Sequence, residues 1–296
     1  MNIGIITVRG SDYHPNRRLR EAATDRGHKI TLVHPYRIWP SLVKNKPSIV
    51  EQQPGIEFLD VVLPRQGATV GNSCLALIRH FSLMGIPVVN DLDSIRLTKN
   101  QFHTLQTMAA ARIPVPDTLF VNSPEGLQEA IARLKGYPVV VKQASGRQGE
   151  GVILVETKHN LESVTCEYLD RRKGLLVQRF IYPVGRQDIR VLVVGEKVVG
   201  AMELRPREGD FRANYHLSKE SSPRDLPQVL EEIALKAASA VGLEIAGVDL
   251  IVDKNDRANV IEVNYSPGFK GMEAATGLDI AAKIVEYVVS TYQKKS

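Results

Sequence analysis

Short apolar segments alternate with amphipathic ones along the chain and predict a mixture of strands and helices. In the first third, these segments are residues 2–8, 17–27, 28–33, 61–64, 74–84 and 86–90. Strand-like and helix-like patterns take turns there, which is typical of a β-α-β arrangement around a parallel sheet. We therefore predict a small parallel α/β domain over residues 1–94.

The later segments form two further groups. Residues 95–181 contain predicted helices at 98–112, 124–134 and 162–172, and predicted strands at 119–121, 138–142, 152–155 and 175–181. Residues 182–296 contain predicted strands at 189–194, 197–204, 247–252 and 258–263, a polar loop at 205–224, and helices at 226–241 and 279–292. A polar turn joins the last two strands, which favours an antiparallel hairpin. The pattern predicts an α/β (α+β) fold of three domains, 1–94, 95–181 and 182–296.

Composition narrows the class of protein. The 296 residues are 43% hydrophobic and 24% charged, which is ordinary for a soluble globular chain. No apolar run reaches the roughly 18 residues that a membrane span needs, and the first residues enter a strand directly, so we expect neither a membrane anchor nor a signal peptide. The two cysteines form no disulfide or metal pattern, which favours the cytoplasm.

The formal charge of +5 favours anionic partners. The Lys and Arg residues are dispersed and are not interleaved with aromatic residues. Nucleotide phosphates are therefore a better match than nucleic acid.

Three oxygen-bearing side chains interrupt the apolar strands of the last hairpin: Asp249, Glu262 and Asn264. Residues two apart on a strand share a face, so Glu262 and Asn264 point the same way, and pairing around the turn would bring Asp249 close to them. Two carboxylates and one amide are hard ligands that suit Mg²⁺. The alternative is a polar patch at a strand end, or a buried aspartate paired with an arginine.

A glycine-rich loop in the second domain has the order G-x-x-G-x-G, with Gly146, Gly149 and Gly151. This order is the reverse of the dinucleotide fingerprint and lies between two strands, which argues against a nicotinamide site. Such a loop either folds as a flap over phosphates or is a plain flexible hairpin. Lys142 ends the apolar strand before it, where it either meets an anionic partner or emerges into solvent.

Other basic residues are candidates for binding anions. Lys99 lies in the first turn of a predicted helix, where the dipole disfavours a cation and a bound phosphate would explain it. Asp188 and Arg190 alternate on one strand face, and Arg190 is either a phosphate or acyl ligand or part of a structural ion pair. A polar loop gathers anion donors around a glycine turn: Arg205, Arg207, Arg212 and Asn214. No hydrolase triad, HExxH, CxxC or Walker lysine supports another chemistry.

Taken in order, these motifs resemble those of the ATP-grasp carboxylate–amine ligases, and most closely the branch of the ribosomal-protein glutamate ligase RimK. The matching segments are Lys99, Val140–Lys142, Gly146–Gly151, Gln178–Ile181, Asp188–Arg190, Glu208–Asn214, Ala246–Asp249, Glu262–Gly268 and Gly277–Ala281. The similarity covers nearly the whole chain, including Pro64–Arg65 and Pro87–Asn90 of the first domain. Each motif alone is weak, whereas the series is specific. The resemblance implies an ATP-grasp fold with a small N-terminal domain, a central domain that bears the lid and a C-terminal antiparallel sheet.

The resemblance also implies roles for these residues. Lys99, Lys142 and the glycine flap would hold ATP phosphates, the backbone of Gln178, Arg179, Phe180 and Ile181 would face adenine, and Asp188 would meet the ribose. Arg190, Arg212 and Asn214 would line the phosphate and acyl end, with Arg205 or Arg212 stabilising the oxyanion. Asp249, Glu262 and Asn264 would bind two Mg²⁺ or Mn²⁺ ions. The implied reaction joins an amino acid, with glutamate favoured, to an amine, peptide or protein acceptor through an acyl phosphate.

Two departures from the family pattern concern specificity. Relatives commonly carry Glu where this chain has Arg179, and a glycine-rich segment is replaced here by residues 217–224 near the acceptor end. The acceptor can therefore differ from a ribosomal protein. The competing hypothesis is a nucleotide-binding regulatory module without turnover, although a degenerate module could lose Lys142, Arg212 and the three metal ligands freely. By analogy with relatives we also expect a homo-oligomer, either a dimer or a tetramer.

Overall fold

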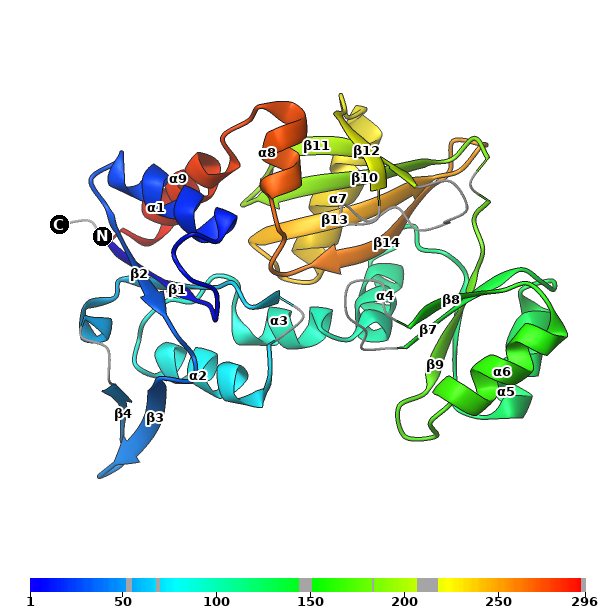
Figure 1. Ribbon diagram of the computed structural model, residues 1–296, viewed down its shortest axis with the longest axis horizontal. Helices are drawn as coiled ribbons and strands as arrows, with labels where there is room; N and C mark the ends of the chain where they lie inside the picture. Colours follow the sequence, from blue (N-terminus) through cyan, green and yellow to red (C-terminus); the bar gives the residue numbers. More distant parts are fainter. Residues whose placement is uncertain (52–54, 68–69, 144–150, 183, 207–217, 294–296) are drawn as a thin grey trace.

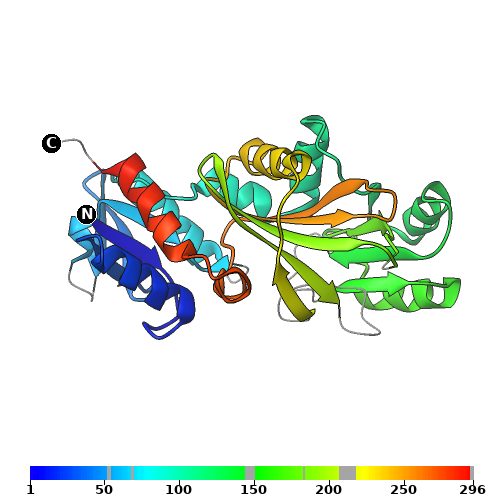
Figure 2. The same cartoon turned by 90° about the horizontal axis from the view of Figure 1, so that it is seen from above.

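The structure is a computed structural model that describes residues 1–51, 55–67, 70–143, 151–182, 184–206 and 218–293. The molecule is elongated, with an N-terminal domain and a central domain at opposite ends and a C-terminal sheet between them (Figures 1 and 2). We retain the predicted division at residues 94 and 181 as a working description.

A parallel sheet of order β2-β1-β5 forms the centre of the N-terminal domain. The elements of this domain are β1 (Asn2–Ile6), α1 (His14–Thr24), β2 (Lys29–Val33), β3 (Ile38–Val43), β4 (Lys46–Glu51), η1 (Ile56–Phe58), β5 (Val61–Pro64) and α2 (Asn72–Leu83). Strands β3 and β4 form a separate antiparallel hairpin that the sequence pattern did not reveal. The parallel sheet confirms the predicted β-α-β opening.

Both faces of this parallel sheet are covered by helices. Alternate β1 residues face opposite sides, so Ile3 and Ile5 pack with α1, whereas Ile6 joins the core beside α2. The last helix, α9 (Ile280–Tyr292), lies alongside α1 and shares its core with β1 (Figure 1). The end of the chain therefore completes the domain that the beginning of the chain builds.

Two short helices replace the predicted helix 98–112. They are α3 (Leu92–Thr98) and α4 (Gln101–Ala110), and the Asn100 side chain caps α4 by accepting from the backbone N–H groups of Phe102 and His103. Lys99 is the C-cap of α3 and does not lie in a first helical turn. Our helix-dipole argument for a phosphate beside Lys99 was therefore wrong, because a helix C-terminus favours a cation.

The central domain consists of an antiparallel sheet of order β6-β9-β7-β8 with two helices on one face. Its elements are β6 (Thr118–Val121), α5 (Pro124–Arg133), β7 (Val139–Gln143), β8 (Val152–Val155), α6 (Lys158–Tyr168) and β9 (Leu175–Arg179). Val139 and Val141 face the helices, so the alternate residues Val140 and Lys142 face the other side. That second face carries Lys142, one of the predicted site residues.

The C-terminal sheet is antiparallel, in the order β12-β11-β10-β13-β14. Its elements are β10 (Gln187–Val194), β11 (Lys197–Pro206), β12 (Ser218–Pro223), α7 (Gln228–Ala240), β13 (Ile245–Val252), β14 (Ala258–Asn264) and α8 (Lys270–Thr276). Part of the predicted polar loop is strand β12, which pairs with β11. Helix α7 covers one face of this sheet, and α8 lies by the other face at β11 and β12.

Asn90 joins the N-terminal domain to the C-terminal sheet. Its amide nitrogen donates to the carbonyls of Ile245 and Tyr265 at 2.7 and 2.8 Å, and its oxygen accepts from the N–H groups of Glu244 and Ile245 at 2.8 and 2.9 Å. The side chain is buried, and these bonds satisfy its polar atoms. Asn90 thus fixes the position of β13 relative to the parallel sheet.

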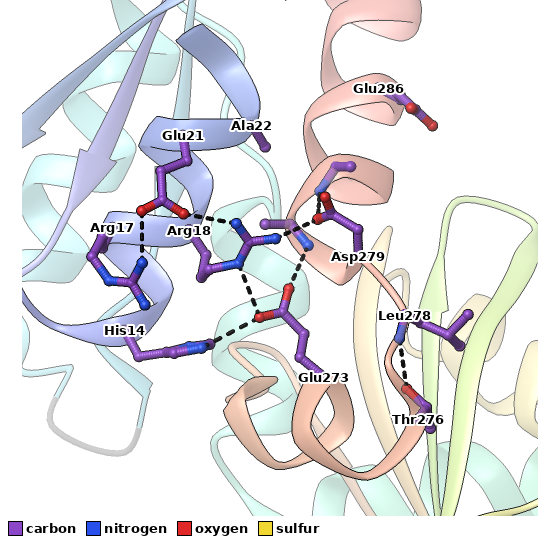
Figure 3. Close-up of polar contacts among 12 residues, drawn as sticks. His14, Arg17, Arg18, Glu21, Ala22, Glu273, Thr276, Leu278, Asp279 and Glu286 are labelled. Carbon is purple, nitrogen blue, oxygen red and sulfur yellow. Dashed lines mark hydrogen bonds and ion pairs between the residues drawn. The ribbon is translucent and has the colours of Figure 1, made fainter. Parts of the chain in front are cut away.

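A second junction lies between α1 and the C-terminal helices (Figure 3). The Arg18 guanidinium reaches Glu21, Glu273 and Asp279 at 2.7, 3.3 and 2.9 Å. Glu273 also accepts from the backbone N–H of Ala281 at 3.2 Å and lies 3.3 Å from the Nε2 atom of His14. These contacts attach α8 and α9 to the N-terminal domain.

In the described part of the chain, no helix is long and apolar enough to cross a bilayer.

Candidate functional site

Three predicted site residues stand side by side across three strands of the C-terminal sheet. In the strand register Arg190 of β10 lies opposite Asp249 of β13, and Asp249 lies opposite Glu262 of β14. Directly opposed residues in antiparallel strands share a face, so the three side chains form a row on the face away from α7. Asp188, two residues before Arg190, shares that face. The predicted proximity of Asp249 and Glu262 is confirmed.

A bulge in β14 is needed for this arrangement. The pairing shifts between Asp249 and Leu250, because Leu250 lies opposite Val260 while Asp249 lies opposite Glu262. Ile261 is the extra residue, and its carbonyl accepts from the Gln101 side chain at 3.3 Å. Val260 and Val263 both remain in the core, whereas Glu262 and Asn264 are directed to the other face.

Asp249 is held by two parallel hydrogen bonds from Arg190. The Nε and Nη2 atoms of Arg190 donate to the two carboxylate oxygens at 2.7 and 2.6 Å. Burial alone would lower the pKa of Arg190, but the Asp249 carboxylate outweighs this effect and raises it. The aspartate–arginine alternative is thus realised, and the planar pair fixes the orientation of the carboxylate.

Glu262 is the second carboxylate of the row. Desolvation by the surrounding protein raises its pKa, although the side chain stays open to solvent, and the Asp249 carboxylate raises it further. Arg190 and Lys142 act in the opposite direction. Two adjacent carboxylates that disfavour each other's charge are a suitable donor set for a hard divalent cation.

Asn264 is the third predicted oxygen donor of the hairpin, at the end of β14. Among the described residues, no group of three His, Cys, Asp or Glu side chains is placed for a metal. Asn264 lies opposite Gly247, whose lack of a side chain is required: a Cβ there would come within 2.8 Å of Pro267. Gly247 thereby lets the loop after β14 fold back close to the three oxygen ligands.

Lys142 lies on the facing side of the central sheet. Its Nζ atom donates to the side-chain oxygen of Gln178 at 2.8 Å, and Gln178 donates to the Thr118 hydroxyl at 2.9 Å. Burial lowers the pKa of Lys142 to about 8, and Glu262 partly counteracts this effect. Lys142 therefore does not emerge into solvent, and the charge interaction with Glu262 connects the two sheets.

Asp188 and the predicted adenine segment meet through Arg186, which sequence reasoning missed. Arg186 donates to the Asp188 carboxylate at 2.9 Å and to the Ile181 carbonyl at 2.7 Å. Burial raises the pKa of Asp188 to about 6, although Arg186 lowers it. The only sequence signal was an arginine two residues before an aspartate, and the structure places this arginine directly ahead of β10.

The predicted hinge strand is shorter than expected. Strand β9 ends at Arg179, and Phe180 and Ile181 follow it outside regular structure. Phe180 packs edge-on against Tyr182 with ring centroids 5.1 Å apart. Arg179 forms an exposed ion pair with Asp117 at 2.5 Å, which directs its side chain to the surface.

Some of the remaining predicted residues lie outside the part of the chain that the structure describes. These are Gly146, Gly149, Arg207, Arg212 and Asn214. Gly151 is described and adopts a positive φ of 74° beside Gln143. Arg205 is exposed on β11, directly after Leu204, which lies opposite Asp188. Strand alternation therefore places Arg205 on the other face of the sheet, which favours Arg212 of the two oxyanion candidates.

Comparisons with known proteins match this geometry to a family. The family model described as a RimK-like ATP-grasp domain matches residues 98–288, and that of the RimK PreATP-grasp domain matches residues 1–95. A probable alpha-L-glutamate ligase of Chromohalobacter salexigens is 38% identical over 97% of this chain and 95% of its own length. A second one, from Thioalkalivibrio sulfidiphilus, is 36% identical over the same shares.

Solved structures share the fold. The RimK domain protein ATP-grasp from Sphaerobacter thermophilus superposes with a TM-score of 0.76 at 26% identity, over 97% of this chain and 99% of that one. The ATP-grasp ligase PsnB, in a complex with a precursor variant, Mg and ADP, has a TM-score of 0.75 at 21% identity over 98% of each chain. The chain is therefore a member of the RimK-like ATP-grasp ligase family.

Proposed function

We propose that the protein forms an amide bond by ATP-dependent activation of a carboxylate, with glutamate as the amino acid that is joined. The observation that carries the proposal is the row of Arg190, Asp249 and Glu262 on the C-terminal sheet, with the buried Lys142 on the central sheet. Two carboxylates, an arginine and a lysine in this arrangement are suited to phosphoryl transfer between anionic groups.

The chemistry explains why no nucleophilic side chain is needed. A carboxylate is a poor electrophile, so its oxygen first attacks the terminal phosphorus of ATP, and ADP leaves. The amine then attacks the acyl carbon, the C–O bond to phosphate breaks, and phosphate departs with the bonding electrons while the amine loses a proton. Cationic side chains stabilise the oxyanion, and we assign this role to Arg212 or Arg205 with Asn214 beside it.

We assign the nucleotide to the side where the two sheets face each other. Lys142 and Lys99 would contact the phosphates, with Gly146, Gly149 and Gly151 forming the flap over them. The backbone from Gln178 to Ile181 would face the base, and Asp188 the ribose. Arg190 would contact the transferred phosphate, and its position on β10, two residues after Asp188 and opposite Asp249, supports this assignment.

The oxygen donors of the C-terminal hairpin fit Mg²⁺ or Mn²⁺. Asp249, Glu262 and Asn264 would hold the metal, with two ions proposed, and the metal would neutralise charge on the β- and γ-phosphates. The two hydrogen bonds from Arg190 to Asp249 would orient the Asp249 carboxylate towards the metal.

The acceptor is proposed more broadly, as a peptide, a protein or a cofactor that carries a carboxylate or an amine. Two kinds of relative support this range: the curated ones are named glutamate ligases, and PsnB is solved with a precursor. Nucleic acid and membrane lipids are not part of the proposal.

The decisive experiment measures phosphate release from ATP with Mg²⁺, while amino acids are supplied singly, in pairs and with a cell extract, and the products are analysed by mass spectrometry. We expect release that depends on glutamate and a product heavier by one glutamyl unit. Glu262→Ala should abolish turnover, whereas Glu129→Ala, an exposed acid on α5, should not. Release with a different amino acid would overturn glutamate, and no release under any condition would support the regulatory module.

We further propose a cytoplasmic homo-oligomer, a dimer or a tetramer. The two cysteines are unpaired, which suits a reducing compartment. The β3–β4 hairpin exposes Trp39, Leu42 and Val50, an apolar surface of the kind that oligomers cover. Light scattering should give a multiple of the 32.8 kDa chain mass, and Leu42→Glu should reduce it.

A further inference from the structure

Arg65 is a partly buried cation that has no acidic partner in the described part of the chain. Its Nη2 atom donates to the Pro267 carbonyl, and its guanidinium lies over the Phe269 ring, 5.7 Å from the centroid. Its Nε atom is buried and has no hydrogen-bond partner. Burial lowers the pKa of Arg65 to about 10. The molecule therefore bears the cost of desolvating this charge without a counterion.

The other partly buried arginines in the described part of the chain are compensated. Arg18 contacts Glu21, Glu273 and Asp279; Arg186 contacts Asp188; Arg190 contacts Asp249; and Arg224 contacts Glu203. The contrast indicates that the anion for Arg65 comes from outside the described chain. A partly buried cation without a counterion is a feature of binding sites.

The position of Arg65 in the fold also suits a ligand. It follows β5, and β1 lies between β5 and β2 in the sheet. The chain leaves β1 towards β2 on one side and returns as β5 on the other, so the carboxyl ends of β1 and β5 form a topological switch point, where open α/β sheets bind ligands.

Two other groups on this side of the molecule point to the same conclusion. Helix α1 starts directly after the loop that follows β1, and its N-cap, Tyr13, makes no side-chain capping bond. The first residue of α1, His14, packs edge-on against Phe269 with centroids 5.9 Å apart, and its buried Nδ1 atom has no partner. Arg65 and His14 thus contact the same ring, each with an unused donor or acceptor.

The loop that Arg65 contacts belongs to the proposed active site. Pro267 lies three residues after the metal-ligand candidate Asn264, and it packs against Gly247 on the neighbouring strand. The Tyr265 hydroxyl donates to the Gly67 carbonyl, two residues after Arg65. An anion on Arg65 would therefore lie beside the metal and phosphate groups without occupying their place.

We infer that Arg65 binds a carboxylate of the incoming amino acid, whose amino group attacks the activated acceptor. This inference rests on the proposed function. The incoming amino acid carries a carboxylate that must be kept away from ATP, and a cation on the N-terminal domain provides that separate place. A guanidinium with an aromatic ring beneath it matches a planar carboxylate well. Arg65 is then a specificity-determining residue for the amine substrate.

The test compares Arg65→Met and Arg65→Lys with the wild-type protein in the phosphate-release assay. We expect Arg65→Met to raise KM for glutamate by about tenfold to a hundredfold, with KM for ATP changed less than twofold. Arg65→Lys keeps the charge and loses the planar fork. Its KM for glutamate should lie between those of the wild type and Arg65→Met. Arg133→Met removes an exposed arginine of α5 and is the matched control, expected to change neither constant.

Direct binding separates this inference from a folding defect. Calorimetry with a non-hydrolysable ATP analogue present should show glutamate binding to the wild type and at least tenfold weaker binding to Arg65→Met, with thermal unfolding confirming that both are folded. 4-Aminobutanoate, which lacks the α-carboxylate, shows which carboxylate is held: equal binding to both proteins assigns the α-carboxylate, and weaker binding to the variant assigns the other.

Failure of this inference is distinguishable from failure of the proposed function. If the wild type releases phosphate with glutamate, and a folded Arg65→Met does so with unchanged KM and affinity, only the role of Arg65 is refuted. If the wild type shows no amino-acid-dependent release, the proposed function fails first. Should Arg65→Met not fold, Arg65→Lys and the wild-type comparison of glutamate with 4-aminobutanoate decide the matter.

Discussion

At the scale of single residues, Lys142 combines burial with a titration near neutral pH. The folded-state pKa of about 8 lies below the ordinary value of 10.5, so the unfolded chain binds more protons between these values. The charged lysine therefore costs stability below pH 8, and the unliganded protein should gain stability as pH rises from 8 to 10.5.

Nucleotide binding should reverse the shift at Lys142. Phosphates beside the amine would restore its proton, so the protein should take up about half a proton per nucleotide at pH 8. Calorimetry in buffers of different ionisation enthalpy measures this uptake. Lys142→Met should abolish the uptake and, in the absence of nucleotide, stabilise the fold by about 1–3 kcal/mol. Uptake that persists in the variant would exclude Lys142 as the phosphate ligand.

Arg190 should matter through its planar geometry as well as its charge. Its two bonds to Asp249 orient a candidate metal ligand, and lysine cannot reproduce them. We expect Arg190→Lys to weaken Mn²⁺ binding by about tenfold to a hundredfold in equilibrium titrations with the nucleotide present. Arg257→Lys, which alters an exposed ion pair in the hairpin turn, is the control and should bind normally. Equal affinity in both variants would refute the orienting role.

The sequence predicted which candidate site residues lie together better than it predicted their hydrogen-bond partners. Asp249 and Glu262 could be placed together from strand spacing, because a hairpin fixes which residues oppose each other. The partners Arg186 of Asp188 and Thr118 of Gln178 could not, since hydrogen bonds between distant segments depend on how two sheets approach. Arg65 was part of the family resemblance, but only the structure showed that no acid contacts it among the described residues.

At the scale of elements, the bulge at Ile261 determines which side chains face the site. If Ile261 took a regular place opposite Asp249, each later residue of β14 would change face, and Glu262 and Asn264 would be directed into the core beside α7. Deletion of Ile261 should keep Glu262 opposite Asp249 in a regular ladder, so Mn²⁺ titration should show that metal binding is retained; loss of binding in this variant would mean that the bulge itself shapes the site. Gln101→Ala removes only the side-chain bond to the bulge and should retain most of the binding.

Elements were predicted well where apolar periodicity was strong and poorly where local capping decides. The strands β1, β10 and β13 followed from apolar runs. The break between α3 and α4 did not, because it depends on Asn100 capping α4 with its side chain, which is a local hydrogen-bond choice within a continuous helical pattern. Strand β12 is polar and gave no strand signal.

At the scale of the whole molecule, Asn90 should be among the residues least tolerant of substitution. Replacement by alanine removes four hydrogen bonds and leaves buried backbone groups unsatisfied on β13 and at Tyr265. We expect Asn90→Ala to destabilise the protein by about 3–5 kcal/mol in urea unfolding. Asn122→Ala, at an exposed site with one long bond of 3.5 Å, should cost less than about 0.5 kcal/mol. A small loss at Asn90 would mean that the domains are joined mainly by apolar packing.

The family resemblance predicted how the domains are arranged. Apolar periodicity alone predicted only the separate helices and strands. A pattern of strands and helices cannot tell that α9 returns to the N-terminal sheet, because either neighbouring domain could have covered its apolar face. That packing involves the residues farthest apart in the chain.

The return of α9 has a consequence for synthesis on the ribosome. Ile3 and Ile5 of β1 are synthesised about 280 residues before Ile284, Val285 and Val288, which complete their cover. One side of the nascent N-terminal sheet therefore stays partly exposed until α9 has been synthesised. A stop codon before residue 280 would yield a chain whose N-terminal sheet keeps an exposed apolar face. Chaperones and proteases recognise such surfaces.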